Sequence, residues 1–330
     1  MKWLQIALVL CGLVLNAGIA SAGARPGRLL VYYGYPSLIN GANGNVATAA
    51  GHFSQYTHVV LGDGLQAASH LDHAKTQQII AHSLAASTKF FGYIDLGVST
   101  QNLTIAQIDQ RAVAWAAMGV DGVLLDDFGY DYGVTRERQN AAVLAVRSHG
   151  LAVIANAFRV EDAFASIPSS ANPTGVAPVL NQQDFYLYES HQVRLGVRED
   201  ELAWWGKSTA IRQYRYYVGF GVLSVTTPAD SGAFDATLWN YAWFSAALFD
   251  HTATGWGEKW YGASNSQAPL RVPPAADDTP FLSTDMSESE GVYSRRTCLN
   301  KLWVNTVTGA AGQTPVLDCA DGIFADGFQN

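Results

Sequence analysis

The sequence predicts an α/β fold, a (β/α)8 barrel of the TIM type followed by a small C-terminal β element. Eight apolar segments of strand length support this fold, and their starts lie 29 to 35 residues apart. Each interval has room for about one strand and one helix. The segments are continuously apolar rather than alternating, which is typical of parallel strands covered on both faces.

The expected strands follow one another at the intervals just described. They begin near Leu29, His58, Lys89, Asp121, Leu151, Asp184, Tyr217 and, more weakly, Thr252. Helices are expected between them, at residues 104–118, 140–149, 199–212 and 235–249. An open doubly wound sheet is the alternative, but no glycine-rich phosphate-binding fingerprint follows the first strand.

The first 22 residues have the features of a secretory signal peptide. Lys2 precedes an apolar run, and Ala20-Ser21-Ala22 forms a small-residue cleavage site. An uncleaved membrane anchor is the alternative. No later segment has the roughly 20 apolar residues needed to span a membrane. We therefore expect a secreted or periplasmic protein with no membrane association after cleavage.

Three further regions are expected after the signal peptide. Residues 23–263 form the barrel, residues 264–286 a Pro-rich linker, and residues 287–330 a small β segment with an acidic tail. Only Cys298 and Cys319 remain after cleavage. Because export leads to an oxidising compartment, we expect these two cysteines to form a disulfide.

The charge of the chain limits its partners. The formal net charge is −8, and it becomes −9 when Lys2 is removed with the signal peptide. No block of Lys or Arg occurs, which argues against nucleic acid and anionic membranes as partners. The expected partner is a neutral or cationic polymer, and the expected state is a monomer.

Polar residues follow the predicted strands at their C-terminal ends. In a barrel of this type those ends form the active-site face. Asp126 ends the fourth strand and Glu189 the sixth, so their side chains can face each other across one pocket. Two carboxyl groups in that arrangement can act as acid and base or nucleophile, so we expect Asp126 and Glu189 to be catalytic.

Other residues near the strand ends are expected to bind substrate. Aromatic rings there could stack on flat ligand faces, although many such rings serve only as core. Acidic residues at strand ends also cap helices or bind loop amides, and this reading stays open for Asp63, Asp127 and Asp131. The predicted substrate-binding set is Tyr33, Asp63, Asp95, Asp127, Tyr130, Asn156, Tyr188, His191 and Trp256.

No cofactor or metal is expected. The sequence has neither a Gly-x-Ser-x-Gly elbow nor a His-Glu-x-x-His motif. The cluster of Asp126, Asp127 and Asp131 could hold calcium, but it lacks the spaced ligands and final Glu of an EF-hand loop.

Three segments carry a family resemblance. The stretches FFGYIDLG, GVDGVLLDDFGYDYG and DFYLYES resemble strand ends of the secreted endo-alpha-1,4-polygalactosaminidases, glycoside hydrolase family 114, and of related spherulin-4-like glycosidases. The resemblance covers about residues 28–262. It implies a glycoside hydrolase that cleaves alpha-linked galactosamine-type polysaccharides, with Asp126 and Glu189 as its two acids. The alternatives are a secreted carbohydrate-binding barrel without catalysis and, on weaker grounds, an assembly or surface-attachment protein.

Overall fold

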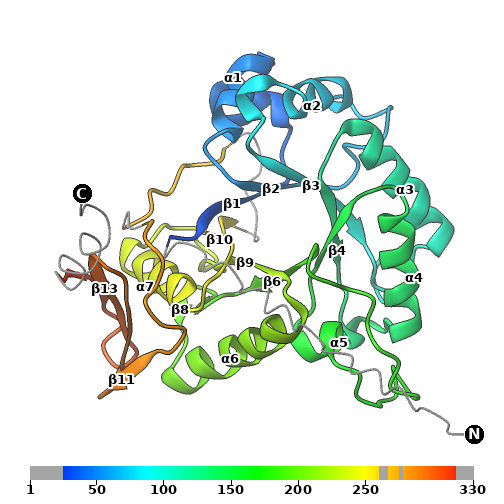
Figure 1. The fold of residues 1–330 in the computed structure, drawn as a ribbon. Coiled ribbons are helices and arrows are strands. Elements are labelled where there is room, and N and C mark those ends of the chain that lie inside the picture. The colour runs from blue at the N-terminus through cyan, green and yellow to red at the C-terminus, as the bar shows by residue number, and fades with distance from the viewer. Residues whose placement is uncertain (1–24, 260–266, 275–277, 317–330) are drawn as a thin grey trace, which may run out of the picture.

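Eight parallel strands close into a barrel, as the sequence predicts (Figure 1). The structure is a computed structural model that describes residues 25–259, 267–274 and 278–316. Around the ring the strand order is β1-β10-β9-β6-β5-β4-β3-β2. The strands are β1 Gly27–Tyr32, β2 His58–Leu61, β3 Lys89–Asp95, β4 Gly122–Asp126, β5 Ala152–Ala155, β6 Phe185–Glu189, β9 Gly221–Val225 and β10 Ala253–Gly255.

Helices connect successive barrel strands and pack on the outside. The α-helices are α1 Val46–Phe53, α2 His73–Ile80, α3 Ile105–Met118, α4 Arg136–Arg147, α5 Val160–Phe164, α6 Glu201–Val218 and α7 Ala236–Leu248. Short 3-10 helices are η1 Pro36–Gly41, η2 Ser83–Ala85 and η3 Tyr130–Tyr132. Between β6 and α6 the chain forms a two-stranded hairpin from β7 Val193–Arg194 and β8 Val197–Arg198. Residues predicted to lie in the signal peptide fall outside the described residues.

Two expected boundaries differ from the structure. The helix expected at 140–149 begins earlier, at Arg136, where the Thr135 side chain accepts a hydrogen bond from a backbone N–H of the first turn. That turn is polar, so apolar periodicity does not reveal it. The helix expected at 199–212 continues to Val218 and ends at Gly219, so the next strand begins at Gly221 rather than Tyr217.

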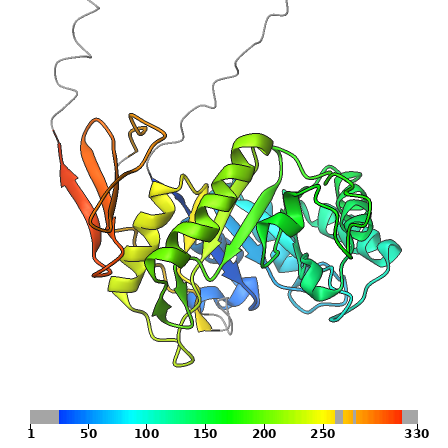
Figure 2. The ribbon, with the colours of Figure 1, turned by 90° about the horizontal axis from the view of Figure 1, so that it is seen from below.

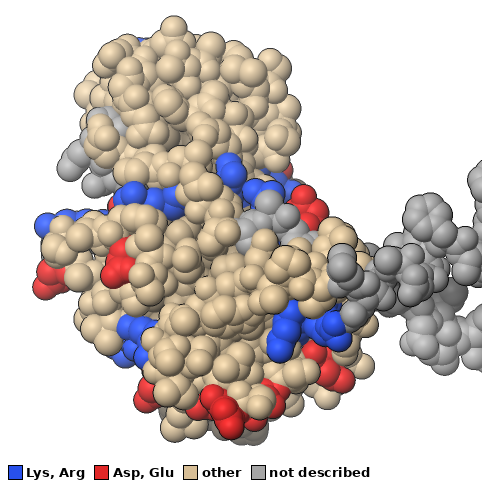
Figure 3. All heavy atoms as spheres, turned by 90° about the vertical axis from the view of Figure 1, so that its left-hand side faces the viewer, with Lys and Arg blue, Asp and Glu red and all other residues tan. Residues whose placement is uncertain are grey.

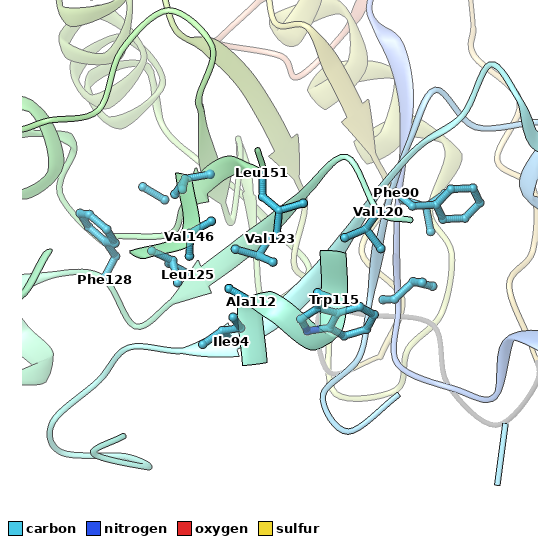
Figure 4. Packing of buried hydrophobic residues seen from close by; sticks show 14 of the residues in the cluster. Phe90, Ile94, Ala112, Trp115, Val120, Val123, Leu125, Phe128, Val146 and Leu151 are labelled. Carbon is cyan, nitrogen blue, oxygen red and sulfur yellow. The ribbon is translucent and has the colours of Figure 1, made fainter. Parts of the chain in front are cut away.

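Two apolar layers stabilise the barrel. One fills its interior with side chains from all eight barrel strands, including Phe91, Leu124 and Leu187. The other lies between the strands and the helices, where Trp115 of α3 packs against the β3–β4 wall (Figure 4). At Gly92 of β3 a Cβ atom would lie 2.1 Å from the Trp115 ring, so only glycine allows the helix this close.

The chain after β10 contributes strands rather than a further helix within its described part. Four antiparallel strands form a small sheet: β11 Ser287–Ser289, β12 Val292–Arg296, β13 Asn300–Asn305 and β14 Ala311–Pro315. This sheet lies beside α7, and Figures 1 and 2 show it on the side of the barrel away from α3 and α4. The domain limits expected from the sequence stay predictions. Of the predicted disulfide pair, Cys319 lies outside the described residues.

A buried arginine joins the small sheet to the barrel. The Arg295 side chain of β12 donates a hydrogen bond to the Leu248 carbonyl oxygen at 2.8 Å and forms an ion pair with Asp250 at 2.8 Å. Its guanidinium also lies 3.8 Å from the centre of the Phe281 ring. The two parts of the molecule are therefore joined by a hydrogen bond and an ion pair.

The extended segment that precedes the sheet is anchored across the seam of the barrel. Asn40 exchanges two hydrogen bonds with the backbone of Ala268, and the Trp239 indole donates one to the Val272 carbonyl oxygen. At the seam itself, β1 pairs with β10 at only two residue pairs, but with β2 at four. Residues 267–274 therefore cross the contact between β1 and β10, which has few backbone pairs of its own.

On the face shown in Figure 3, Lys and Arg side chains and Asp and Glu side chains form small groups between larger uncharged areas. Among the helices that the structure describes, none has the length and apolar character needed to cross a membrane.

Candidate functional site

Asp126 and Glu189 end two strands at the same rim of the barrel. Asp126 is the last residue of β4 and Glu189 the last residue of β6, with β5 between them. Parallel strands bring their C-terminal ends to one face, so the two carboxyl groups meet at the barrel mouth. The sequence predicts this convergence from the position of each acid directly after an apolar strand.

Asn156 connects the two carboxyl groups. It follows β5, and its side-chain Nδ2 donates hydrogen bonds to Asp126 Oδ1 at 2.7 Å and to Glu189 Oε2 at 3.2 Å. Both side chains are therefore held against one amide nitrogen. Asn156, predicted as a substrate-binding residue, here fixes the distance between the two acids.

Burial keeps the proton affinity of both acids high. Loss of solvent is the main cause that raises the pKa of Asp126 above its ordinary value. Hydrogen bonds from Tyr93, Asn156 and the Asp127 backbone oppose this rise because they favour the charged form. Burial, with repulsion from Asp126, raises the pKa of Glu189 to about 7. Fewer hydrogen bonds stabilise the charged form of Glu189.

Two further aspartates lie beside the pair. Asp95 ends β3 in register with Asp126 and accepts a hydrogen bond from the Thr100 hydroxyl at 2.7 Å. Asp127 has a left-handed backbone with φ of 52° and packs against Gly97. Burial and the charges of Asp126 and Asp95 raise the pKa of Asp127 to about 6. The mouth therefore has a concentration of carboxyl groups, and the proton affinity of three of them is raised.

Two tyrosines cover one side of the pair. The rings of Tyr33 and Tyr93 meet edge to face with centroids 6.0 Å apart. Burial, followed by the charge of Asp126, raises the pKa of both phenols, so both hydroxyls stay protonated. Tyr33 lies at the mouth as expected for a substrate-binding residue. Tyr93 is a partner of Asp126 that ring stacking alone would not identify.

Two of the predicted substrate-binding residues have partners away from the two acids. Asp63 pairs with Arg111 at 3.1 Å and accepts a bond from the Gly64 backbone, as its alternative structural reading predicts. Tyr130 lies on η3, where its ring faces the Arg136 guanidinium at 5.7 Å. Neither side chain is held with Asp126 and Glu189.

Three others lie in the layers behind the mouth. Tyr188 alternates with Glu189 along β6, so its ring points into the strand–helix layer. His191 is fully buried, and its ring Nε2–H donates a hydrogen bond to the Ala242 carbonyl oxygen at 3.2 Å. Trp256 is buried with α7 and the ring of Phe234. Strand-end position alone could not show to which side these rings turn.

Sequence reasoning did not identify Lys207, which lies on α6. Its ammonium faces the Tyr188 ring at 4.7 Å and the Phe158 ring at 5.1 Å. Among the described acids, Glu189 has the largest electrostatic effect on it. The helix that carries Lys207 is predictable, but the sequence contains no signal that turns this residue toward Glu189.

Within the described residues, no group of three or more His, Cys, Asp or Glu side chains is arranged to hold a metal ion.

The pKa values of Asp127 and Glu189, raised to about 6 and about 7, identify these two carboxyl groups as proton-binding groups near neutral pH.

The protein belongs by its architecture among (β/α)8 barrels. No protein-family model matches the sequence, and no curated protein matches it. Similar solved structures include the carboxyl transferase domain of Rhizobium etli pyruvate carboxylase, at 11% identity and a TM-score of 0.44. The alignment covers 70% of this chain and 39% of that one, so this chain spans well under half of that protein.

Two other similar structures are enzymes of different classes. Oxaloacetate acetylhydrolase is 12% identical with a TM-score of 0.39, and the alignment covers 69% of this chain and 75% of that one. The YdjI aldolase from Escherichia coli K12 is 13% identical with a TM-score of 0.39, covering 71% and 75%. At such identities the activities of these proteins do not transfer to this chain.

The predicted glycosidase activity is corrected by this comparison. A carboxyl transferase, an acetylhydrolase and an aldolase are found, and a racemase from Streptomyces coelicolor is a fourth. None of these four is a glycosidase, and the expectation of a polysaccharide-cleaving enzyme is withdrawn. The family resemblance is not tested by these structures.

Proposed function

We propose that this protein is an enzyme that transfers protons to and from a polar substrate, with Asp126 and Glu189 as its acid–base pair. The observation that carries this proposal is the shared donor Asn156, which bonds both carboxyl groups at one point of the mouth. Two carboxyl groups held this close and out of water cannot both ionise easily, so the pair retains a proton near neutral pH.

The surroundings divide the roles within the pair. Asp126 accepts hydrogen bonds from Tyr93, Asn156 and the Asp127 backbone, and all three favour its charged form. Glu189 has Asn156 as its hydrogen-bond donor and a pKa of about 7. Asp126 therefore serves as the base and Glu189 as the acid, because different environments separate the proton affinities of similar groups.

The mouth favours neutral or cationic substrates. Asp95, Asp126, Asp127 and Glu189 concentrate negative charge there, and protonated phenols of Tyr33 and Tyr93 supply hydrogen-bond donors. A polyanionic substrate would meet repulsion at this rim. Asp126 and Glu189 together can take a proton from carbon or oxygen and return it.

Exchange of substrate hydrogen in D2O tests this function and does not require the product to be identified. The wild type is incubated with panels of neutral and cationic hydroxy, amino and carbonyl compounds, and NMR detects deuterium at carbon. Glu189→Gln and Asp126→Asn should each slow exchange about 10²- to 10⁴-fold, the usual contribution of one general acid or base.

Asp63→Asn provides the control, because Asp63 pairs with Arg111 away from the two acids. It should exchange at the wild-type rate. If an exchanging compound is found and both acid variants match the wild type, Asp126 and Glu189 are not the proton-transfer groups.

A further inference from the structure

Lys207 occupies an unusual place for a lysine. Of the described lysines, it alone is half-buried, whereas Lys75, Lys89, Lys259 and Lys301 are exposed. It lies two turns into α6, the helix that follows β6 and therefore starts at the barrel mouth. Its Nζ atom lies between the faces of Tyr188 and Phe158, and the Phe158 side chain is largely exposed.

The amine has no close carboxylate in the described part of the chain. None of the ion pairs there, all within 4.0 Å, includes Lys207. The charges that face it at longer range are Glu189 of β6, Glu161 of α5, Glu199 just before α6 and Arg194 of β7. The amine thus contacts two aromatic faces, has a protonatable acid at longer range, and is not held in a salt bridge.

We propose that Lys207 is a carbonyl-capturing amine of this site, so that the substrate class is an aldehyde or ketone. Its nitrogen attacks the carbonyl carbon and one amine proton moves to the carbonyl oxygen. Glu189 supplies the second proton, so that the oxygen leaves as water and the nitrogen is left as a protonated imine. The product is an imine at Nζ, and no oxidant or reductant is needed. The inference rests on the proposed acid–base function for this proton supply.

Burial prepares the amine for this reaction. Loss of solvent lowers the pKa of Lys207 to about 8, although the charges of Glu189 and Glu161 act in the opposite direction. Contact of an ammonium with two rings favours the charged form, so burial outweighs that contact. A desolvated lysine with lowered pKa has a larger neutral fraction, and only the neutral amine attacks carbon.

An imine would also give the neighbouring acids, Asp126 and Glu189, a proton to transfer. The positive nitrogen of a protonated imine withdraws electrons from the adjacent carbon, which makes hydrogen on that carbon easier to remove. Asp126 and Glu189 would then take and return that proton. Capture by Lys207 and proton transfer by the two acids are separate steps that can be measured separately.

Pentane-2,4-dione is the probe for capture. It condenses with a neutral amine, losing water, to give a conjugated enaminone that absorbs in the near ultraviolet. At pH 7, wild type should form one enaminone per chain, and peptide mapping should place it on Lys207. From the difference in pKa, Lys207 should react roughly a hundredfold faster than an ordinary exposed lysine.

Two arginine variants make a matched pair. Lys207→Arg keeps the positive charge and the ring contacts but cannot form the enaminone, so the absorbance should be lost. Lys89→Arg should react as the wild type does; Lys89 also lies over a ring, that of Phe185 at 5.9 Å, but at the start of β3, the end of the barrel away from the mouth. Equal absorbance from the wild type and Lys207→Arg would overturn the proposal.

Two measurements on the wild type guard against a variant that does not fold. The rate of capture should rise with pH to a half-maximum near pH 8, and an adduct mapped to another lysine would contradict the assignment. Glu189-dependent deuterium exchange without capture at Lys207 would reject the imine and leave the proposed function standing. Capture at Lys207 with exchange that does not depend on either acid would reject the proposed function instead.

Discussion

Two buried histidines behind the mouth make the stability of the folded protein depend on pH. The rings of His191 and His251 are buried with centroids 4.7 Å apart, and His191 follows Glu189 by two positions. Burial lowers the pKa of His191 to about 3 and that of His251 well below its ordinary value. Both rings are therefore neutral in the folded protein at any pH near neutrality.

This burial predicts acid sensitivity. In the unfolded chain His191 binds a proton below about pH 6.5, whereas in the folded protein it does so only near pH 3. The unfolded state thus binds more protons in this window, so stability is lost as pH falls from about 6.5 toward 3. Each of the two histidines should contribute a slope of up to about 1.4 kcal/mol per pH unit.

Chemical unfolding between pH 4 and 7 measures the slope. His191→Gln keeps a donor for the Ala242 carbonyl oxygen and removes one titrating group, so its slope should be shallower than that of the wild type. A steeper slope for His191→Gln would show that His191 is not the group responsible.

At the scale of one element, the contact of α3 with β3 depends on the absence of a side chain. A Cβ atom at Gly92 would overlap three atoms of the Trp115 ring, and Trp115 is fully buried. Gly92→Ala should therefore lower the free energy of unfolding by about 1–3 kcal/mol or more, the usual cost of overpacking a core.

At a second glycine, substitution by alanine should have the opposite effect on the free energy of unfolding. Gly51 lies inside α1, and nothing lies within 4 Å of the position that a Cβ atom would take. Gly51→Ala should stabilise the protein by about 0.5–1 kcal/mol, since alanine is the better helix former. Urea unfolding of both variants checks the contrast, and equal effects would mean that Trp115 moves aside freely.

Most strand positions were predictable because most strands lie in largely apolar runs, whereas side-chain direction was not. Asp126 and Glu189 were placed by the rule that strand ends meet at one face. Trp256 and Tyr188 follow the same rule in sequence, yet their rings turn into the helix layers. Lys207 faces Glu189 at longer range from a neighbouring helix, and such a placement depends on tertiary packing that no local pattern records.

On the scale of the whole molecule, Arg295 connects the small sheet to the barrel. Its side chain is 2% exposed and pairs with Asp250, which is 26% exposed. Arg295→Met should lower the free energy of unfolding by about 3 kcal/mol, because Asp250 and the Leu248 carbonyl oxygen lose their donor. Lys301→Met, on the exposed position of β13, should change it by less than about 0.5 kcal/mol.

Calorimetry tests whether the arginine contacts stabilise the protein. If the sheet and barrel unfold together, Arg295→Met lowers the temperature of a single transition. A variant that melts at the wild-type temperature would show that the arginine contacts contribute no net stability.

The short contact between β1 and β10 affects the barrel while the chain is being synthesised. Synthesis proceeds from the N-terminus, so the hydrogen-bonding edge of β1 stays open until residue 255 has left the ribosome. An open strand edge is a template for pairing with another chain. Here the closing strand offers only two residue pairs. Until β10 is made, this edge of the nascent barrel is therefore open to pairing with another chain, and residues 267–274 cross the contact between β1 and β10 once it has formed.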